Sequence, residues 1–270
     1  MIIENNGLIS LSNSKTECII SLFGGQIVSY RPKEQKHDVF WLGELNKFDN
    51  VSAIRGGVPV CWPRFAAEDL NNHFPRHGFA RISMWNLQKV NVTDEKIEAV
   101  LSLPPQERYD ADIAANLFIT ITDKLECSLE TLNNGNDDFM FSEALHAYFN
   151  VGNRDDTVIK GLKGHKYKSS LDGKVYTLED DLLITGEFDA AFMGHNGSVQ
   201  IEDKVFNRVI TVKKIGSDST IVWNPNKDLV EMRAGQYKNF ICVEPANQGE
   251  NFVKLKAKQK HKITMIIEVK

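Results

Sequence analysis

The 270-residue sequence predicts an all-β protein, a large antiparallel β-sandwich. Short segments in which apolar and polar residues alternate recur along most of the chain, and a period of two is typical of strands with one buried face. No window sustains apolar residues at i, i+3, i+4 and i+7 over several helical turns, so few helices are expected. Many strands at short spacing with few helices favour packed antiparallel sheets.

In the first half of the chain, strands are expected at residues 8–11, 17–23, 26–30, 85–92, 96–103, 117–121 and 125–129. The first three follow one another across short breaker-rich turns, as in an opening meander. From Ile97 to Leu103 apolar residues alternate with more polar ones, which predicts a strand buried on one face. The last two expected strands flank Thr122-Asp123-Lys124 and should form a hairpin.

In the second half, strands are expected at residues 157–160, 198–201, 208–213, 219–223, 240–243 and 262–269. The breaker-rich segments 133–138 and 194–198 have the length of turns and not of linkers. We therefore expect one domain over residues 1–270.

Charge and composition narrow the class of protein. A net charge of -4 and an isoelectric point near 6.0 provide no basic field for nucleic acid or an anionic membrane. The first residues lack the basic start and the roughly 7 to 15 apolar residues of a signal peptide. No apolar run reaches the roughly 18 residues of a membrane span. We expect a cytoplasmic monomer whose partner is a small molecule.

The chain has four cysteines, Cys18, Cys61, Cys127 and Cys242, which lie far apart in the sequence. Three of them fall inside apolar, strand-like runs, which predicts buried reduced thiols. Their spacing fits neither a zinc site nor a disulfide framework.

A loop over residues 53–81 concentrates unusual residue types. It contains two adjacent glycines and three prolines, which permit close backbone approach and stiffen the path. The same loop carries four arginines among aromatic residues: Arg55, Arg64, Arg76 and Arg81. Arginine has a planar fork that suits phosphate or carboxylate, so this loop could form an anion cradle. The alternative is a surface loop whose arginines pair with some of the 36 acidic residues.

Five motifs in order resemble one known family. They are Arg55-Gly56-Gly57-Val58-Pro59-Val60-Cys61-Trp62-Pro63, His77-Gly78-Phe79-Ala80-Arg81, Glu143-Ala144-Leu145-His146-Ala147-Tyr148-Phe149, Trp223-Asn224-Pro225 and Cys242-Val243-Glu244-Pro245. Together they are similar to the glucose-6-phosphate 1-epimerase branch of the aldose 1-epimerase, or galactose mutarotase-like, family. The resemblance covers nearly the whole chain. It implies a β-supersandwich in which a concave sheet face binds sugar.

His146 is the first candidate catalytic residue. If residues 142–150 form one strand, His146 shares a face with small and polar neighbours, where a ligand could approach. Glu143 has the opposite parity and should not be its carboxylate partner. A half-exposed strand histidine is the alternative, and the resemblance favours catalysis.

Glu244 is the second candidate. It ends an apolar run just before Pro245, so we expect the strand to stop there and the carboxylate to emerge partly buried. Partial burial would raise its pKa toward the range of a general base. The alternative is a rim glutamate paired with a lysine such as Lys238. The resemblance implies that Glu244 is the catalytic base.

The substrate-binding residues implied by the resemblance are Arg55, Arg76, His77, Arg81 and Asp189. The arginines would hold a phosphate. For Arg76, and also for Arg64, the alternative is a local ion pair. His77 would face the sugar, unless it is a loop histidine satisfied by backbone. Asp189 matches a substrate-holding aspartate, although Ala190 stands where the family has arginine, and a turn aspartate after Gly186 competes.

Two tryptophans that could offer a sugar platform, Trp62 and Trp223, are expected in the core instead. The function implied by the resemblance is interconversion of α and β glucose 6-phosphate by acid/base ring opening at C1, without cofactor or metal. Related hexose 6-phosphates are further candidate substrates. Two alternatives stay open: a mutarotase for neutral aldoses, and a non-catalytic sugar-phosphate-binding protein on the same fold.

Overall fold

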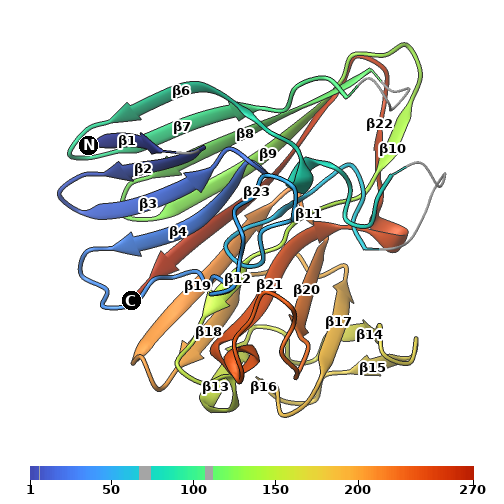
Figure 1. Ribbon diagram of the computed structural model, residues 1–270. Helices are drawn as coiled ribbons and strands as arrows, with labels where there is room; N and C mark the ends of the chain where they lie inside the picture. Colours follow the sequence, from blue (N-terminus) through green and yellow to red (C-terminus); the bar gives the residue numbers. More distant parts are fainter. Residues whose placement is uncertain (6, 67–73, 107–111) are drawn as a thin grey trace.

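The computed structural model describes residues 1–5, 7–66, 74–106 and 112–270. Regular structure in these ranges is almost entirely β-strand (Figure 1), which confirms the all-β expectation. The helices in the described ranges are four short 3₁₀ segments, Ala80–Ile82, Arg154–Asp156, Gln236–Asn239 and Gly249–Asn251. None of these is long and apolar enough to cross a membrane.

The strands form two large sheets and two small ones. A nine-stranded sheet has the order β16-β13-β18-β19-β23-β9-β8-β7-β6. Its strands are β16 (Leu182–Leu183), β13 (Thr157–Lys160), β18 (Val199–Asp203), β19 (Arg208–Ile215), β23 (Lys260–Val269), β9 (Leu125–Asn133), β8 (Ile113–Ile121), β7 (Ile97–Ser102) and β6 (Asn86–Val92). The opening meander is a four-stranded sheet of β1 (Ile2–Asn5), β2 (Leu8–Ser12), β3 (Thr16–Ser21) and β4 (Gln26–Pro32). A two-stranded sheet pairs β10 (Phe139–Phe141) with β22 (Val253–Leu255).

The eight-stranded sheet carries the candidate site residues His146, Asp189 and Glu244 on or beside its strands. Its order is β15-β14-β17-β20-β21-β11-β5, and β12 also pairs with β21. Its strands are β15 (Val175–Thr177), β14 (Lys166–Ser169), β17 (Phe188–Met193), β20 (Ser219–Asn224), β21 (Phe240–Asn247), β11 (Glu143–Leu145), β5 (Val60–Cys61) and β12 (Tyr148–Asn150). Figure 1 shows β21 and β20 side by side in the middle of the molecule.

The two faces of β21 have different neighbours because successive side chains of a strand point to opposite sides. Ile241 and Val243 belong to the main core, together with buried residues of the nine-stranded sheet. Phe240, Cys242 and Ala246 lie in two smaller apolar clusters on the other face. This second face, on which Glu244 also lies, is the one that the site uses.

The expected strands are present with shifted ends, but two local expectations are wrong. Residues 142–150 do not form one strand: β11 ends at Leu145 and β12 begins at Tyr148, and the backbone amide of His146 donates to the carbonyl of Pro59 at 3.0 Å. The strand at Glu244 does not stop at Pro245 either. Strand β11 pairs with Ala246 and Asn247 of β21 but not with Pro245. Proline has no amide hydrogen to donate, so Pro245 breaks no hydrogen bond between β21 and β11.

All four cysteines are free and buried, as the apolar runs around three of them predict.

Candidate active site

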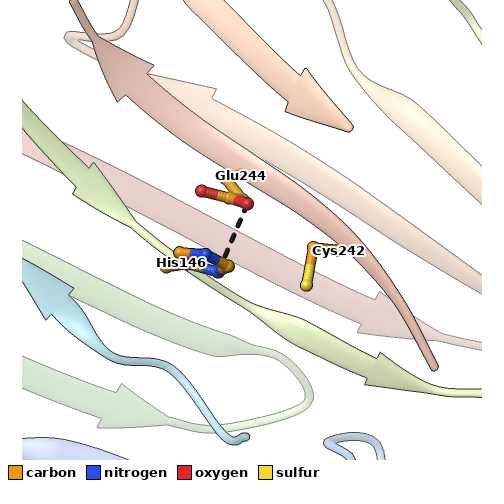
Figure 2. A group of neighbouring side chains, drawn as sticks. All are labelled: His146, Cys242 and Glu244. Carbon is orange, nitrogen blue, oxygen red and sulfur yellow. Dashed lines mark ion pairs between the residues drawn. The ribbon is translucent and has the colours of Figure 1, made fainter. Parts of the chain in front are cut away.

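The strand register places His146 opposite Glu244. β11 pairs Ala144 with Ala246, β12 pairs Tyr148 with Cys242, and both pairings share one register. The interruption between β11 and β12 therefore brings His146 level with Glu244, as Figure 2 shows. Nδ1 of His146 lies 3.2 Å from Oε1 of Glu244.

The pair is buried and has no other polar partner. The side chain of Glu244 is 1% exposed and that of His146 is 12% exposed, so His146 is not a half-exposed strand histidine. Neither Nδ1 of His146 nor either oxygen of Glu244 makes a hydrogen bond within the described residues. Lys238 is directed elsewhere, 3.8 Å from Asp155, which removes the alternative of a rim ion pair for Glu244.

Burial shifts the pKa values of Glu244 and His146 in opposite directions. It raises the pKa of Glu244 well above its usual value, and the nearby carboxylate of Asp189 adds to this effect. Burial also lowers the pKa of His146, and the positive charges of Arg55 and Arg81 lower it further. In the absence of substrate, the surroundings thus favour the uncharged forms of both residues.

Glu143 is held away from this pair, as its parity predicts. Its Oε1 accepts hydrogen bonds from Asn247 at 2.9 Å and contacts Nε2 of His261 at 2.8 Å. It therefore belongs to a separate buried network on the other side of β11.

A cavity of about 720 Å³ opens over the pair. The sequence singles out seven candidate site residues, and all seven line this cavity: Arg55, Arg76, His77, Arg81, His146, Asp189 and Glu244. The structure thus brings together residues that are spread over most of the chain.

Arg55 is fixed by backbone and side-chain contacts. The next two residues, Gly56 and Gly57, have positive φ, and a Cβ on Gly57 would lie 2.1 Å from the carbonyl oxygen of Ile27. Only glycine permits this approach. The guanidinium of Arg55 donates through Nε to Glu231 and through Nη1 to Tyr148, each at 3.2 Å.

The other arginines of the loop differ in their access to the cavity. Nη2 of Arg81 donates to the carbonyl of Arg76 at 3.1 Å, and its buried Nε has no hydrogen-bond partner within the described residues. Arg76 is exposed, lines the cavity, and has no carboxylate within 4.0 Å in the described ranges. Arg64 does not line the cavity, and its Nη1 donates to the carbonyl of Phe74 at 2.5 Å.

His77 lines the cavity and is also hydrogen-bonded to the backbone of its own loop. Its Nδ1 accepts a hydrogen bond from the backbone amide of Ala66 at 3.3 Å, and its ring lines the cavity. Burial lowers its pKa to about 3, and Arg81 and Arg76 contribute to this shift. A neutral ring that accepts at Nδ1 carries its proton on Nε2, so His77 can donate a hydrogen bond from there.

Asp189 lies in β17 and not in a turn, which removes the alternative stated for it. It pairs with Trp223 of β20, and burial raises the pKa of its carboxyl. Trp223 also lines the cavity, so its expected place in the core is wrong. Trp62 is fully buried and donates from Nε1 to Thr131 at 2.9 Å, as expected for a core residue.

The sequence reasoning missed further cavity residues: Ser170, Glu187, Lys227 and Gln248. Lys227 lies 3.9 Å from Glu187 in an exposed, weak ion pair. Alternation along β20 could have indicated Trp223, because Ile221 and Trp223 share one face. Nothing local in the sequence marks the other four.

The pair and one neighbouring cysteine offer three donor atoms that could bind a metal ion. His146, Cys242 and Glu244 offer atoms that all lie within 4.8 Å of one another (Figure 2). Cys242 is fully buried and does not line the cavity, whereas His146 and Glu244 do. The donor set therefore suits an acid/base pair better than a metal centre.

Known proteins resemble this chain throughout. The model of the family described as aldose 1-epimerase matches residues 7–268. A protein of Haemophilus influenzae named "Putative glucose-6-phosphate 1-epimerase" is 32% identical over 216 residues, which cover 80% of this chain and 75% of that protein. A protein of Escherichia coli with the same name is 29% identical over 265 residues, with 94% and 87% covered.

The fold is shared as well. The crystal structure of "a putative mutarotase (YeaD)" from Salmonella typhimurium has a TM-score of 0.90 and 25% sequence identity, and covers 99% of this chain and 92% of that one. A galactose mutarotase-like protein from Lactobacillus casei has a TM-score of 0.76 at 17% identity, a likeness of fold alone. With a family match from residue 7 to residue 268, the chain belongs to the aldose 1-epimerase family, and it is an isomerase that acts on a sugar.

Proposed function

We propose that the protein is a hexose-6-phosphate mutarotase that interconverts the α and β anomers of glucose 6-phosphate. The observation that supports this proposal is the position of Arg55, Arg76 and Arg81 on the cavity that contains His146 and Glu244. Arginine forks suit a phosphate dianion, and a neutral sugar would leave these charges without a ligand. The names of the two relatives refer to the same substrate.

The proposed reaction is a pair of proton transfers. The carboxylate of Glu244 removes the proton of the C1 hydroxyl while the imidazolium of His146 protonates the ring oxygen, and the bond between C1 and the ring oxygen breaks. The aldehyde then rotates about the bond between C1 and C2 and recloses on its other face, with the transfers reversed. Each transfer of this type contributes roughly 10² to 10⁴-fold to the rate.

The surroundings of the pair favour ring opening. Before opening, Glu244 is negative and His146 is positive; afterwards the carboxyl is protonated and the imidazole is neutral. Burial favours these uncharged forms, as the directions of both pKa shifts indicate. Since the two groups lie 3.2 Å apart, the proton that they share can pass between them before substrate binds. The catalytic step therefore runs toward the protonation state that the protein prefers.

The remaining cavity residues would hold the substrate. Arg55 and Arg81 would bind the 6-phosphate, with Arg76 at the exposed edge. Asp189 and the Nε2 proton of His77 would contact sugar hydroxyls, since both line the cavity beside the pair.

Anomer exchange measured by NMR tests this proposal on glucose 6-phosphate and glucose in parallel. We expect kcat/KM for the phosphorylated sugar to be higher by at least tenfold, because one hydrogen bond to a charged group contributes about 1.5 to 3 kcal/mol. Equal values would indicate a mutarotase for neutral aldoses. Binding of glucose 6-phosphate without exchange would indicate a non-catalytic sugar-phosphate-binding protein. Galactose and mannose 6-phosphates in the same assay determine the preferred hexose.

A further inference from the structure

Tyr148 connects Arg55 to His146. Its hydroxyl accepts a hydrogen bond from Nη1 of Arg55 at 3.2 Å. Its ring stacks on the imidazole of His146, with ring centroids 4.9 Å apart and an angle of 9° between the planes. Tyr148 is 2% exposed and does not line the cavity, so it acts on a ligand only through these two neighbours.

The orientation of Arg55 depends on Tyr148 and Glu231. These two residues take Nη1 and Nε, and within the described residues Nη2 has no acceptor. Arg55 thus offers Nη2 to a ligand while its other nitrogens are held. A ligand that moves or orders this guanidinium also acts on the Tyr148 hydroxyl.

The orientation of His146 depends on aromatic contacts. Its buried Nδ1 has no hydrogen bond within the described residues that would fix the ring plane. Tyr148 stacks on one face of the imidazole, and Trp223 meets it at 87° with centroids 5.8 Å apart. An acid that must reach a ring oxygen needs a defined ring plane, and stacking on Tyr148 supplies one.

We propose that Tyr148 is a positioning residue that transmits occupancy of the anion site at Arg55 to the acid His146. A phosphate on Arg55 orders the Tyr148 hydroxyl, and the ordered tyrosine ring holds the imidazole in the plane required for proton transfer. The inference rests on the proposed function. Its consequence is that the phosphate raises kcat and does not merely lower KM, a use of remote binding energy for catalysis.

The test uses the variant Tyr148→Phe, which keeps the stacked ring and removes the hydroxyl. Anomer exchange is measured for glucose 6-phosphate, for glucose, and for glucose with added inorganic phosphate. In the wild type, kcat for glucose 6-phosphate exceeds that for glucose, and inorganic phosphate accelerates glucose exchange. In Tyr148→Phe we expect the ratio of the two kcat values to fall about tenfold, as loss of one hydrogen bond to a charged group allows.

Two controls make the result specific. Tyr237→Phe removes a hydroxyl from the same aromatic cluster, away from the cavity, and should leave the kcat ratio unchanged. In an Arg55→Ala background, Tyr148→Phe should have no further effect on the ratio, because the connection is already cut.

The possible failures are distinguishable. If the wild type shows no preference for glucose 6-phosphate, the proposed function is wrong, and the transmission through Tyr148 with it. If the wild type prefers glucose 6-phosphate and Tyr148→Phe keeps the full kcat ratio and the full activation by inorganic phosphate, the proposed function stands and the transmission alone is wrong.

Discussion

Nδ1 of His146, in the interruption between β11 and β12, lies 3.2 Å from Oε1 of Glu244 in β21, and neither atom has a hydrogen bond within the described residues. A buried carboxyl and a buried imidazole without other polar partners are poorly suited to a purely structural role, because each loses hydration without compensation. The arrangement suits two groups that exchange protons with a ligand.

Removing either group should abolish most of the exchange. Glu244→Gln keeps the shape of the side chain and removes the base, so the rate should fall about 10² to 10⁴-fold while substrate still binds. His146→Asn should behave similarly. The measurement is the anomerisation rate above the spontaneous background at saturating glucose 6-phosphate.

The double variant of His146 and Glu244 shows whether they share one step. If they do, its rate should be scarcely lower than that of the poorer single variant. Losses that multiply, or near wild-type exchange in Glu244→Gln, would contradict the assignment.

Arg55→Ala and Arg81→Ala should each weaken binding of the phosphorylated substrate. Loss of a hydrogen bond to an ionised phosphate corresponds to about a 10- to 100-fold rise in KM for glucose 6-phosphate. KM for glucose should change little, which serves as the internal control. An unchanged KM for glucose 6-phosphate in both variants would remove the phosphate assignment.

Substitutions of Arg76 and Arg64 should have different effects on substrate binding and on stability. Arg76 lines the cavity, whereas Arg64 donates to the carbonyl of Phe74. Arg76→Gln should therefore raise KM for glucose 6-phosphate and leave the Tm near that of the wild type. Arg64→Gln should lower the Tm and leave KM for glucose 6-phosphate near that of the wild type. Thermal unfolding and exchange kinetics on the same samples decide the matter, and a lowered Tm with full affinity in Arg76→Gln would favour a structural role.

The pH dependence should follow the pair and not isolated groups. Exchange requires one proton on the pair, so it should fall at acid pH, below the lowered pKa of His146, where both groups are protonated. It should fall again at alkaline pH, above the raised pKa of Glu244, where the shared proton is lost. The pH profile of kcat/KM is measured on glucose as well as on glucose 6-phosphate. Glucose is the control because the phosphate group itself titrates at about pH 6.

Asp189→Asn should shift the alkaline limb of this pH profile in a defined direction. The carboxylate of Asp189 helps to raise the pKa of Glu244. Its removal should move the alkaline limb to lower pH, whatever it does to substrate affinity. A limb that stays in place or moves upward would show that the alkaline limb does not report Glu244.

Cys242 should be dispensable for the reaction. If His146 and Glu244 act as acid and base, Cys242→Ser and treatment with a chelator such as EDTA should each change kcat less than about twofold, since neither removes a proton-transfer group. Loss of exchange on chelation, restored by zinc, would instead show that the three donor atoms hold a metal.

The fold could be predicted from the sequence where burial alternates along a strand. Strands β7 and β8, with every second residue buried, carry the period of two that local reasoning detects. Strands β14 and β15 are not predicted, because both are short and most of their residues are exposed. Strand β14 pairs with β17, which is a non-local cause, and β15 pairs with β14.

The same distinction applies to the site. Motifs indicated His146 and Glu244, but their 3.2 Å contact depends on the register between segments about 100 residues apart, which no local pattern contains. Tyr148 illustrates the difference best. It stands in one of the sequence motifs, whereas its contacts with Arg55 and His146 emerge only from the packed structure.

The separation of the site into a sheet part and a loop part has a consequence for how this scaffold can diversify. His146 and Glu244 are aligned by neighbouring strands of one sheet, whereas Arg76, His77 and Arg81 lie on the connection between β5 and β6. Substitutions on the connection can alter which sugar is accepted without disturbing the register that aligns His146 with Glu244. A directed-evolution library aimed at new sugars should therefore randomise that connection and leave the interruption between β11 and β12 intact.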